Sequence, residues 1–391
     1  MADDPPSLTI LGVHLKSDGY PNVTYRVQAL NACATMRVRE INYPFRAEPD
    51  NSAKSVRLIA ALRTVVRAFR FIYAHLHVIV RYLGTDKKGV VYLPYPAVLL
   101  LLLFSILPRF VRPQSIAVDA FISVYDTVIT DRKLVRADSI VGRLIWWLEN
   151  RAYGVADVVI VDTIFNAQYF NQTFPSLRTC EVVPLPLSIN ESFFCSAEYP
   201  PSSSACHVVF LGTFVPLQGV DTIAKAAVLL ADRADIRITL VGNGQTADSV
   251  KEILSHRECR NIEWISGWQN KEQVKAHIVG ANICLGIFGV GDKAQRVWPF
   301  KNYHYMAVGR PLITGDTECA RYLALKSGGA APFLTVPCGD AFALAEAIRT
   351  LADSPESRTQ LGMLGQQYYL SHLSSKAAVA HLLAILQRIS G

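Results

Sequence analysis

The sequence predicts an α/β protein made of two doubly wound domains that face each other across a cleft. Three observations support this prediction. Short apolar stretches alternate with helical ones in the first half, the same alternation recurs in the second half, and a run of prolines and serines separates the halves. Continuous Val/Ile/Leu strands separated by helices are typical of parallel sheets buried on both faces.

The predicted strands of the first half are LTILGV, MRVREI, GVVYLP, SIAVDAF, DVVIVD and CEVVPLP, and those of the second half are HVVFLG, RITLVG, IEWISG, ICLGIF, RPLIT and PFLTVP. Between them, LSINESFFCSAEYPPSSSAC is typical of an inter-domain linker. We therefore place an N-terminal domain at residues 1–188 and a C-terminal domain at 206–372. We expect a last helix, at 373–391, to pack back towards the first domain.

Composition agrees with a folded protein of two domains. The 391 residues are 51% hydrophobic and 18% charged, and domains average about 150 residues. The eight cysteines are scattered without Cys-x-x-Cys, and the N-terminus has no signal-peptide pattern, so we expect reduced thiols and a cytoplasmic location. Cys284 lies in an apolar strand and is expected in the core. Asp-x-Asp, a common carboxylate pair for a divalent ion, is absent, so we expect no metal site.

The net charge of +7 is concentrated in the first half, where residues 51–118 hold ten Lys or Arg and one acid. Within this stretch, residues 54–81 predict a basic amphipathic helix with Arg63, Arg67 and Arg70 on one side. Such a helix binds an anionic membrane surface, to which each basic side chain contributes about 1 kcal/mol. A helix packed on a sheet with its polar face in water is the alternative. We expect no nucleic-acid partner, because the aromatic side chains follow one apolar face instead of forming stacking platforms.

The apolar stretch after this helix, Ala97 to Leu107, is shorter than the ~20 residues that a membrane span needs. Two prolines precede it and a predicted strand follows, which favours a buried crossover helix. The sequence thus predicts a surface-attached protein at the inner face of a membrane, without a transmembrane helix.

The segment Leu285–Asp316 carries the strongest functional signal. Its order is a strand end, a loop with three cations, a short helix over about Tyr303–Val308, a glycine stop and a second buried strand; the cations are Lys293, Arg296 and Lys301. A cationic loop that leads into a helix N-terminus favours a diphosphate, because unpaired N–H groups and the helix dipole attract negative charge. A solvated surface loop is the alternative.

Three further loops follow strands of the second half, at Gly212–Gly219, Asn243–Gln245 and Trp268. Ligands of doubly wound sheets bind beyond the carboxyl ends of the strands. A single glycine loop is a weak signal, since any tight turn favours glycine. Four loops in register, one of them cationic, predict a nucleotide site in the cleft.

At these residues the C-terminal half resembles the retaining glycosyltransferases of family four, whose two Rossmann-like domains form the GT-B architecture. The matching motifs are Phe210-Leu-Gly followed by Gly219-Val-Asp, Leu240-Val-Gly-Asn-Gly244, Ile265-Ser-Gly-Trp268 and Lys301-Asn-Tyr-His-Tyr-Met-Ala-Val-Gly-Arg-Pro-Leu-Ile313. They cover residues 210–316, whereas the first half agrees in pattern only. The resemblance assigns nucleotide-sugar binding to the second domain and acceptor binding to the first.

The resemblance implies a nucleoside diphosphate sugar as donor substrate and no cofactor. The base is expected near Trp268 and the diphosphate between Gly212 and the helix near Tyr303. The full set of expected donor-binding residues is Gly212, Thr213, Gln218, Asn243, Gly244, Trp268, Lys293, Arg296, Lys301, Tyr303 and His304.

The chain departs from the family pattern at four of these positions. Two family glutamates, separated by seven intervening residues, are replaced by Arg296 and His304, and the usual Arg and Lys of the first glycine loop are replaced by Thr213 and Gln218. His304 can still hydrogen-bond a ribose hydroxyl, while the three cations of the loop can replace the missing charges.

Breaking a glycosyl–phosphate bond leaves extra negative charge on the nucleotide, which fixed cations stabilise in the transition state. Lys301 and Arg296 are predicted for this role. Asp126 ends a strand of the first domain and is predicted to act near the reacting carbon; an N-cap or turn aspartate is the alternative. Gly19 and Tyr20 lie in the first strand-to-helix loop, which in similar enzymes approaches donor and acceptor; an ordinary connection is the alternative.

Together these features predict a metal-independent retaining glycosyltransferase at the cytoplasmic membrane surface, acting on a glycan or lipid-linked acceptor. Retention follows from the resemblance alone. A nucleotide-sugar 2-epimerase of the same fold would bind the same donor without an acceptor. A non-catalytic nucleotide-sugar-binding or scaffold protein is the third hypothesis, because fold does not fix function.

Overall fold

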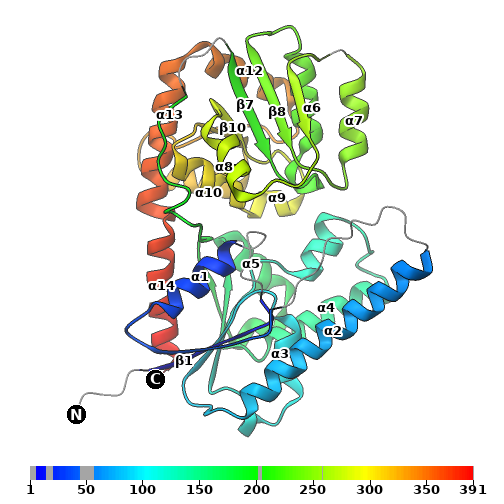
Figure 1. Cartoon of the computed structure of the whole chain (residues 1–391), viewed down its shortest axis with the longest axis vertical. Helices are drawn as coiled ribbons and strands as arrows, with labels where there is room; N and C mark the ends of the chain where they lie inside the picture. Colours follow the sequence, from blue (N-terminus) through cyan, green and yellow to red (C-terminus); the bar gives the residue numbers. More distant parts are fainter. Residues whose placement is uncertain (1–5, 15–20, 45–56, 201–204, 258, 391) are drawn as a thin grey trace.

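The computed structural model describes residues 6–14, 21–44, 57–200, 205–257 and 259–390, without the side chains of residues 57–65. It has two lobes, each built around one six-stranded sheet with helices on both faces (Figure 1). The predicted fold class is confirmed, and each predicted strand is present. Gly19, Tyr20 and residues 54–56 lie outside the described residues.

The sheet of the N-terminal lobe has the strand order β2-β1-β3-β4-β5-β6, and all its pairings are parallel. Leu8 in β1 lies between Val38 and Val90. The strands are β1 (Ser7–Gly12), β2 (Arg37–Asn42), β3 (Val90–Leu93), β4 (Ser115–Asp119), β5 (Val158–Val161) and β6 (Glu181–Pro184). Strand β2 is added on one side of β1, and the later strands are added on the other side. Because each crossover is right-handed, the first helix and the later helices lie on opposite faces of the sheet.

Helix α1 (Pro21–Asn31) covers one face of this sheet together with the C-terminal helix α14 (Ser375–Ser390). The opposite face is covered by α2 (Arg57–Leu83), α3 (Val98–Ile106), α4 (Ile140–Tyr153) and α5 (Ile164–Thr173). Short helical segments are η1 (Arg109–Val111), the π-helical η2 (Asp126–Asp131) and η3 (Pro175–Thr179). Helix α2 confirms the predicted long helix over its described part, and α3 confirms the predicted crossover helix. Among the described residues, none of the helices combines the length and the apolar character needed to cross a bilayer.

The C-terminal lobe has the strand order β12-β11-β10-β7-β8-β9, again all parallel. Its strands are β7 (Cys206–Leu211), β8 (Ile236–Val241), β9 (Ile262–Ile265), β10 (Ile283–Leu285), β11 (Leu312–Gly315) and β12 (Leu334–Val336). Cys284 in β10 is fully buried, as predicted. The carboxyl ends of both sheets meet at the cleft, where the site residues are found.

Two helical layers enclose the second sheet. One face packs against α6 (Val220–Leu229), α7 (Ala247–Ser255) and α12 (Ala341–Asp353). The other packs against α8 (Lys271–Val279), α10 (Phe300–Val308), α11 (Glu318–Lys326), α13 (Pro355–Tyr368) and the π-helical η5 (Tyr369–Leu373). The short η4 (Pro216–Gln218) and α9 (Asp292–Arg296) lie at the cleft.

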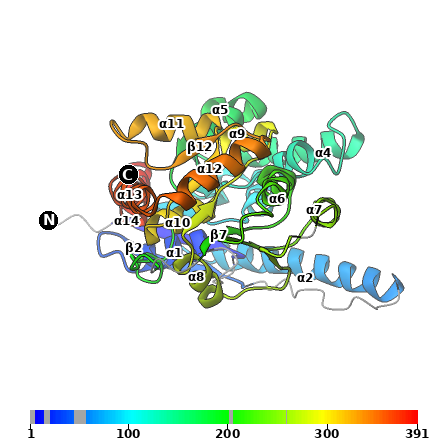
Figure 2. The ribbon, with the colours of Figure 1, turned by 90° about the horizontal axis from the view of Figure 1, so that it is seen from above.

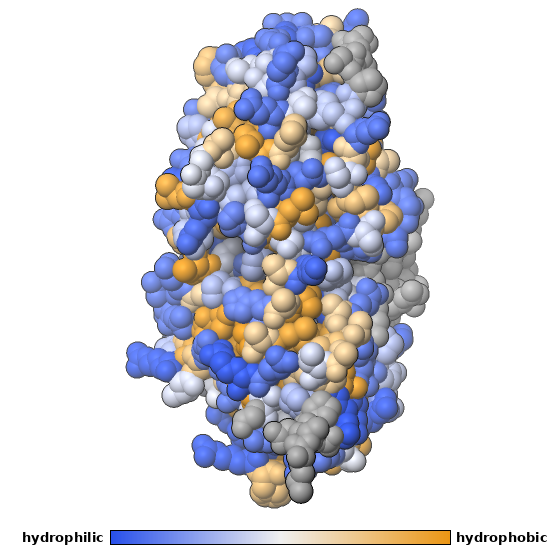
Figure 3. Space-filling view, turned by 90° about the vertical axis from the view of Figure 1, so that its left-hand side faces the viewer, coloured by the Kyte–Doolittle hydropathy of each residue, from blue (hydrophilic) through white to orange (hydrophobic). Residues whose placement is uncertain are grey.

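The chain passes between the lobes twice on the same side of the molecule, first in the linker after β6 and again from α13 through η5 into α14 (Figures 1 and 2). Ser375 ties the two passages together, because its Oγ accepts from the backbone N of Ile189 (2.7 Å) and its own N donates to Glu191 (2.6 Å). On the α13–α14 side, hydrophobic residues gather mainly on the N-terminal lobe (Figure 3).

The predicted cationic loop and helix need correction. Lys293 and Arg296 lie in the short helix α9, not in a loop, and α10 begins at Phe300 instead of near Tyr303. Lys301 is therefore in the first turn of α10. The helix ends where predicted, because Gly309 adopts φ +82°, a left-handed conformation that favours glycine at a helix C-terminus.

Candidate functional site

Lys301 lies at the carboxyl end of β7, inside the cleft-facing part of the C-terminal lobe. Its Nζ donates to Gln218 Oε1 (2.6 Å) and lies 3.6 Å from the centre of the Phe210 ring. Gly212 adjoins this contact, since a Cβ added to Gly212 would lie 3.4 Å from Gln218 Oε1. The structure thus brings together Lys301, Gln218 and Gly212, three of the residues that the sequence predicts for donor binding.

Lys301 is only 9% exposed, and burial lowers its pKa well below the ordinary value for lysine. A diphosphate beside the Nζ would favour the charged ammonium form. Binding of an anion at this position should therefore be accompanied by proton uptake.

The loop that carries Gln218 is held by a close approach of two backbones. Gly219 has φ +63°, and a Cβ there would lie 2.4 Å from the carbonyl carbon of Phe288. The backbone N of Phe288 donates to the carbonyl of Gln218 (3.0 Å). Only glycine fits between these segments, so Gly219 fixes the loop against the end of β10.

Arg296 and Lys293 point across the cleft to Asp126 at the start of η2. Asp126 accepts from an Arg296 Nη (2.7 Å) and lies 3.2 Å from Lys293 Nζ, and all three side chains are largely buried. The other Nη of Arg296 donates to Asn166 (2.6 Å), and the guanidinium lies 3.7 Å from the centre of the Tyr169 ring. These contacts form an inter-lobe ion cluster.

Further hydrogen bonds join the lobes around this cluster. Thr163 Oγ1 donates to the carbonyl of Arg296 (2.6 Å), and the backbone N of Leu217 donates to Asp131 (3.1 Å). Burial raises the pKa of Asp131 above its ordinary value. Neither Arg296 nor Lys301 points into bulk water, but only Lys301 adjoins the glycine loop.

A cavity of about 460 Å³ lies between α1 of one lobe and α8 of the other. Trp268 and His304, which the sequence places near the base and the ribose, both line it. Trp268 is 81% exposed, whereas the His304 ring stacks on Phe194 with 3.9 Å between centres. The remaining lining residues are Pro21, Thr24, Tyr25, Gln28, Asn190, Phe193, Gln269, Lys271 and Val274.

The Nε2 of His304 is buried without a hydrogen-bond partner among the described residues. Burial lowers the pKa of His304 to about 3, so its imidazole is neutral at neutral pH. His304 can therefore offer one hydrogen bond to a ligand but no charge to a diphosphate.

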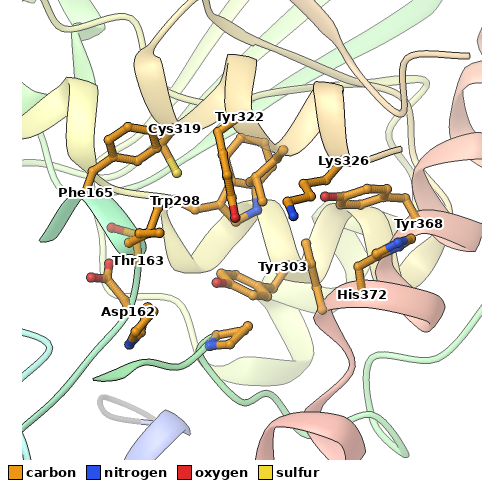
Figure 4. A pocket seen from close by; sticks show the side chains of 15 residues that line it. Asp162, Thr163, Phe165, Trp298, Tyr303, Cys319, Tyr322, Lys326, Tyr368 and His372 are labelled. Carbon is orange, nitrogen blue, oxygen red and sulfur yellow. The ribbon is translucent and has the colours of Figure 1, made fainter. Parts of the chain in front are cut away.

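Tyr303, the neighbour of His304, faces a second cavity of about 260 Å³ on another side of α10 (Figure 4). Its hydroxyl oxygen accepts from the backbone N of Leu187 (3.3 Å). Asp162 also lines this cavity, and burial raises its pKa to about 6. The structure therefore separates Tyr303 from the other predicted donor residues.

The remaining predicted residues lie on exposed loops of the C-terminal lobe. Thr213, Asn243 and Gly244 are exposed at the ends of β7 and β8. The Oδ1 of Asn243 accepts from the backbone N of Gly244 (2.8 Å). Within the described ranges, no group of three His, Cys, Asp or Glu side chains is arranged to hold a metal ion.

Comparison with known families adds one decisive observation to this geometry. A family model described as glycosyl transferases group 1 matches residues 205–354, which contain Gly212, Gln218 and Lys301. The match places residues 205–354, within the C-terminal lobe, in the glycosyl transferases group 1 family. The resemblance seen in the sequence is thereby confirmed.

The chain is similar to the lipopolysaccharide core biosynthesis glycosyltransferase LpsD of Rhizobium meliloti (strain 1021), with 24% identity over 197 residues. The match covers 49% of this chain and 52% of LpsD, so it spans about half of that relative.

Two solved structures share the fold over nearly the whole chain. Sucrose-phosphate synthase from Thermosynechococcus elongatus has a TM-score of 0.69 at 15% identity, with 98% of this chain and 99% of that chain covered. HepE of Anabaena in complex with UDP has a TM-score of 0.63 at 12% identity, with 98% and 100% covered. Both likenesses confirm the GT-B fold of the chain.

Sequence reasoning missed the residues of the N-terminal lobe that contribute to the candidate site. Asn166 and Tyr169 on α5 hold Arg296, and Tyr25 and Gln28 on α1 line the larger cavity. No sequence motif marks them, because each contacts a residue more than a hundred positions away. The N-cap at Thr163 was the available signal that α5 begins at the cleft.

His304 leads to a first testable expectation. Its folded-state pKa of about 3 lies below the ordinary value of 6.5, so between these values the unfolded chain binds a proton that the folded chain does not. Stability should then fall as pH falls below about 6.5. In urea titrations, the free energy of unfolding of both proteins should decrease as the pH is lowered from ~6.5 to ~5. We expect this decrease to be about 1.5 kcal/mol smaller for His304→Gln than for the unmodified chain. Equal losses would show that His304 is protonated in the folded state.

Proposed function

We propose that this chain is a retaining glycosyltransferase that moves a sugar from a nucleoside diphosphate sugar to a glycan or lipid-linked acceptor at the cytoplasmic membrane surface. The observation that carries the proposal is the position of Lys301, a buried cation beside the glycine loop at the carboxyl end of β7. It lies in the region that matches the glycosyl transferases group 1 family.

The chemistry of sugar transfer requires such a cation. Cleavage of the glycosyl–phosphate bond increases the negative charge on the nucleotide, and a preorganised ammonium stabilises this charge more in the transition state than in the ground state. Lys301 is held by Gln218 and the Phe210 ring, so little reorganisation is needed when charge develops.

The larger cavity supplies the nucleotide end of the proposed site. Trp268 offers an exposed aromatic face for a base, and the unpaired Nε2 of His304 suits a ribose hydroxyl. HepE, which shares the fold, was solved with UDP, and this supports a uridine nucleotide as the first donor to test.

Two observations support the proposed acceptor and location. LpsD is named for lipopolysaccharide core biosynthesis, which favours a glycan acceptor that is attached to a lipid. Helix α2 presents exposed Arg70 and Arg81 on the surface of the N-terminal lobe, as a membrane-binding helix would.

The proposal is tested by thermal unfolding with UDP-, GDP-, ADP- and TDP-sugars, followed by incubation with the labelled donor that binds. We expect one nucleotide to stabilise the chain by about 2.7 kcal/mol at ~100 times its Kd. We expect the bound donor to be hydrolysed slowly and its sugar to be transferred with retained configuration once an acceptor is supplied.

Other results would select the other hypotheses. Epimerisation of the sugar without an acceptor would identify a 2-epimerase. Binding without hydrolysis or transfer would identify a non-catalytic nucleotide-sugar-binding protein. Absence of stabilisation by any of the four nucleotides would refute the donor site itself.

A further inference from the structure

Helix α2 has two apolar faces, and one of them is not used for packing. Ala74, Val78 and Tyr82 are buried against the sheet. A second stripe, at spacings of three and four residues, faces outward and consists of Phe69 (69% exposed), Tyr73 (58%), Leu76 (47%), Val80 (68%) and Leu83 (37%). Side chains with this spacing share one face of a helix, so α2 presents an apolar stripe to solvent.

Helix α4 repeats this arrangement on the same side of the sheet. Glu149, Ala152 and Tyr153 are buried, whereas the outward stripe consists of Ile140 (87% exposed), Leu144 (51%) and Trp147 (51%). An ordinary amphipathic helix would carry polar residues at these three positions.

Helix α3 lies between α2 and α4 in the same layer and contacts both. Its Ile106 is 72% exposed, and Phe110 of the following η1 is 83% exposed. Figures 1 and 2 place α2 and α4 on the same side of the N-terminal lobe, away from α13 and α14. We call the outward stripes of α2 and α4, with Ile106 and Phe110, the three-helix apolar surface. Monomeric soluble proteins rarely expose so many large apolar side chains in neighbouring elements.

Basic residues accompany this surface and acidic ones are scarce. The exposed cations on its elements and on the turn after α2 are Arg70, Arg81, Lys88, Arg109, Arg143 and Arg151. Exposed acids nearby are Asp86 and Asp138, and Asp138 pairs with Arg136. Apolar side chains with a positive surround match an anionic bilayer, whereas a second copy of the same positive surface would be repelled.

We propose that the three-helix apolar surface inserts into the acyl region of an anionic bilayer, with α4 as a second anchor beside α2. The inference rests on the membrane location in the proposed function and deepens it, because the contact is apolar as well as electrostatic. Two anchors in one layer fix the orientation of the lobe, which a single basic helix does not.

The orientation matters for the cleft. The side chain of Leu134 is 63% exposed. Its backbone N donates to the carbonyl of Val128 in η2 (2.9 Å), so Leu134 lies next to this helix. η2 begins with Asp126 of the inter-lobe ion cluster. The apolar surface thus extends along α4 towards the edge of the cleft, and docking brings that edge next to the lipid headgroups.

The test is co-sedimentation of the full chain with phosphatidylglycerol/phosphatidylcholine vesicles at low salt and at ~1 M salt, where charges are screened beyond about 3 Å. We expect part of the binding to survive high salt. We expect Ile140→Ser/Trp147→Ser to weaken vesicle binding at least tenfold. The matched control, Leu325→Ser/Met363→Ser, removes exposed apolar residues from the C-terminal lobe and should bind like the unmodified chain.

Three results would overturn the inference: complete loss of binding at ~1 M salt, unchanged binding of the Ile140→Ser/Trp147→Ser variant, or a dimer in solution that this variant converts to a monomer without any vesicle binding. Charge reversal at Arg67 and Arg70 separately tests the basic helix, since it should abolish only the salt-sensitive part. Nucleotide-sugar stabilisation of the same variants reports on the proposed enzymatic function, so the two proposals fail independently.

Discussion

Replacing Lys301 by methionine is expected to lower the rate of sugar transfer about a hundredfold while leaving the fold intact. The loss in rate follows from removal of the fixed cation beside Gly212 and Gln218. Stability should not fall, because methionine fills similar space and a buried ammonium is costly to desolvate. Initial rates with the identified donor and urea unfolding of the same samples measure both effects.

Lys251→Met is the matched control, because Lys251 is exposed on α7 of the same lobe. It should retain the full rate. UDP affinity provides a further check: it should decrease as pH rises in the unmodified chain, since burial lowers the pKa of Lys301 and the diphosphate needs the ammonium. A Lys301→Met variant with normal rate and normal UDP affinity would remove the basis of the proposed function.

Asp126→Asn is expected to lower the free energy of unfolding by about 3 kcal/mol. The substitution leaves Arg296 and Lys293 largely buried without their carboxylate, at side-chain exposures of 10% and 14%. Removing one partner of a buried ion pair is costly for this reason, even where the intact pair adds little to stability. Urea unfolding followed by tryptophan fluorescence measures the change.

Asp138→Asn serves as the comparison, because Asp138 pairs with Arg136 on the surface, where both side chains are mostly exposed. No resolvable change in stability is expected for it. If Asp126→Asn proved as stable as Asp138→Asn, the inter-lobe ion cluster would not be a stabilising contact in solution.

The sequence predicted the sheets well because their strands carry a strong local signal. β3, β5 and β10 are continuous apolar runs, and burial on both faces of a parallel sheet imposes that pattern. The end of α10 was predictable for a similar reason, since Gly309 adopts a backbone conformation that few other residues tolerate.

The pairing of the cations was not predictable in this way. Arg296 and Asp126 are 170 positions apart, so no local pattern joins them, and the sequence predicts a separate role for each. The start of α10 was missed because Pro299 and Phe300 looked like loop residues, although proline is common next to a helix start. The outward apolar stripe of α2 was also hidden, since periodicity does not tell which of two apolar faces packs on the sheet.

The two passages of the chain between the lobes, tied at Ser375, lie on the α13–α14 side, whereas α9 lies away from it (Figures 1 and 2). Two lobes that are connected on one side open most on the opposite side of the cleft. Asp126, Lys293 and Arg296 lie away from the connected side and hold the two lobes together there. Entry and exit of a nucleotide would then require the ion pairs of Asp126 to break. The strength of these ion pairs would therefore set the turnover rate of the enzyme.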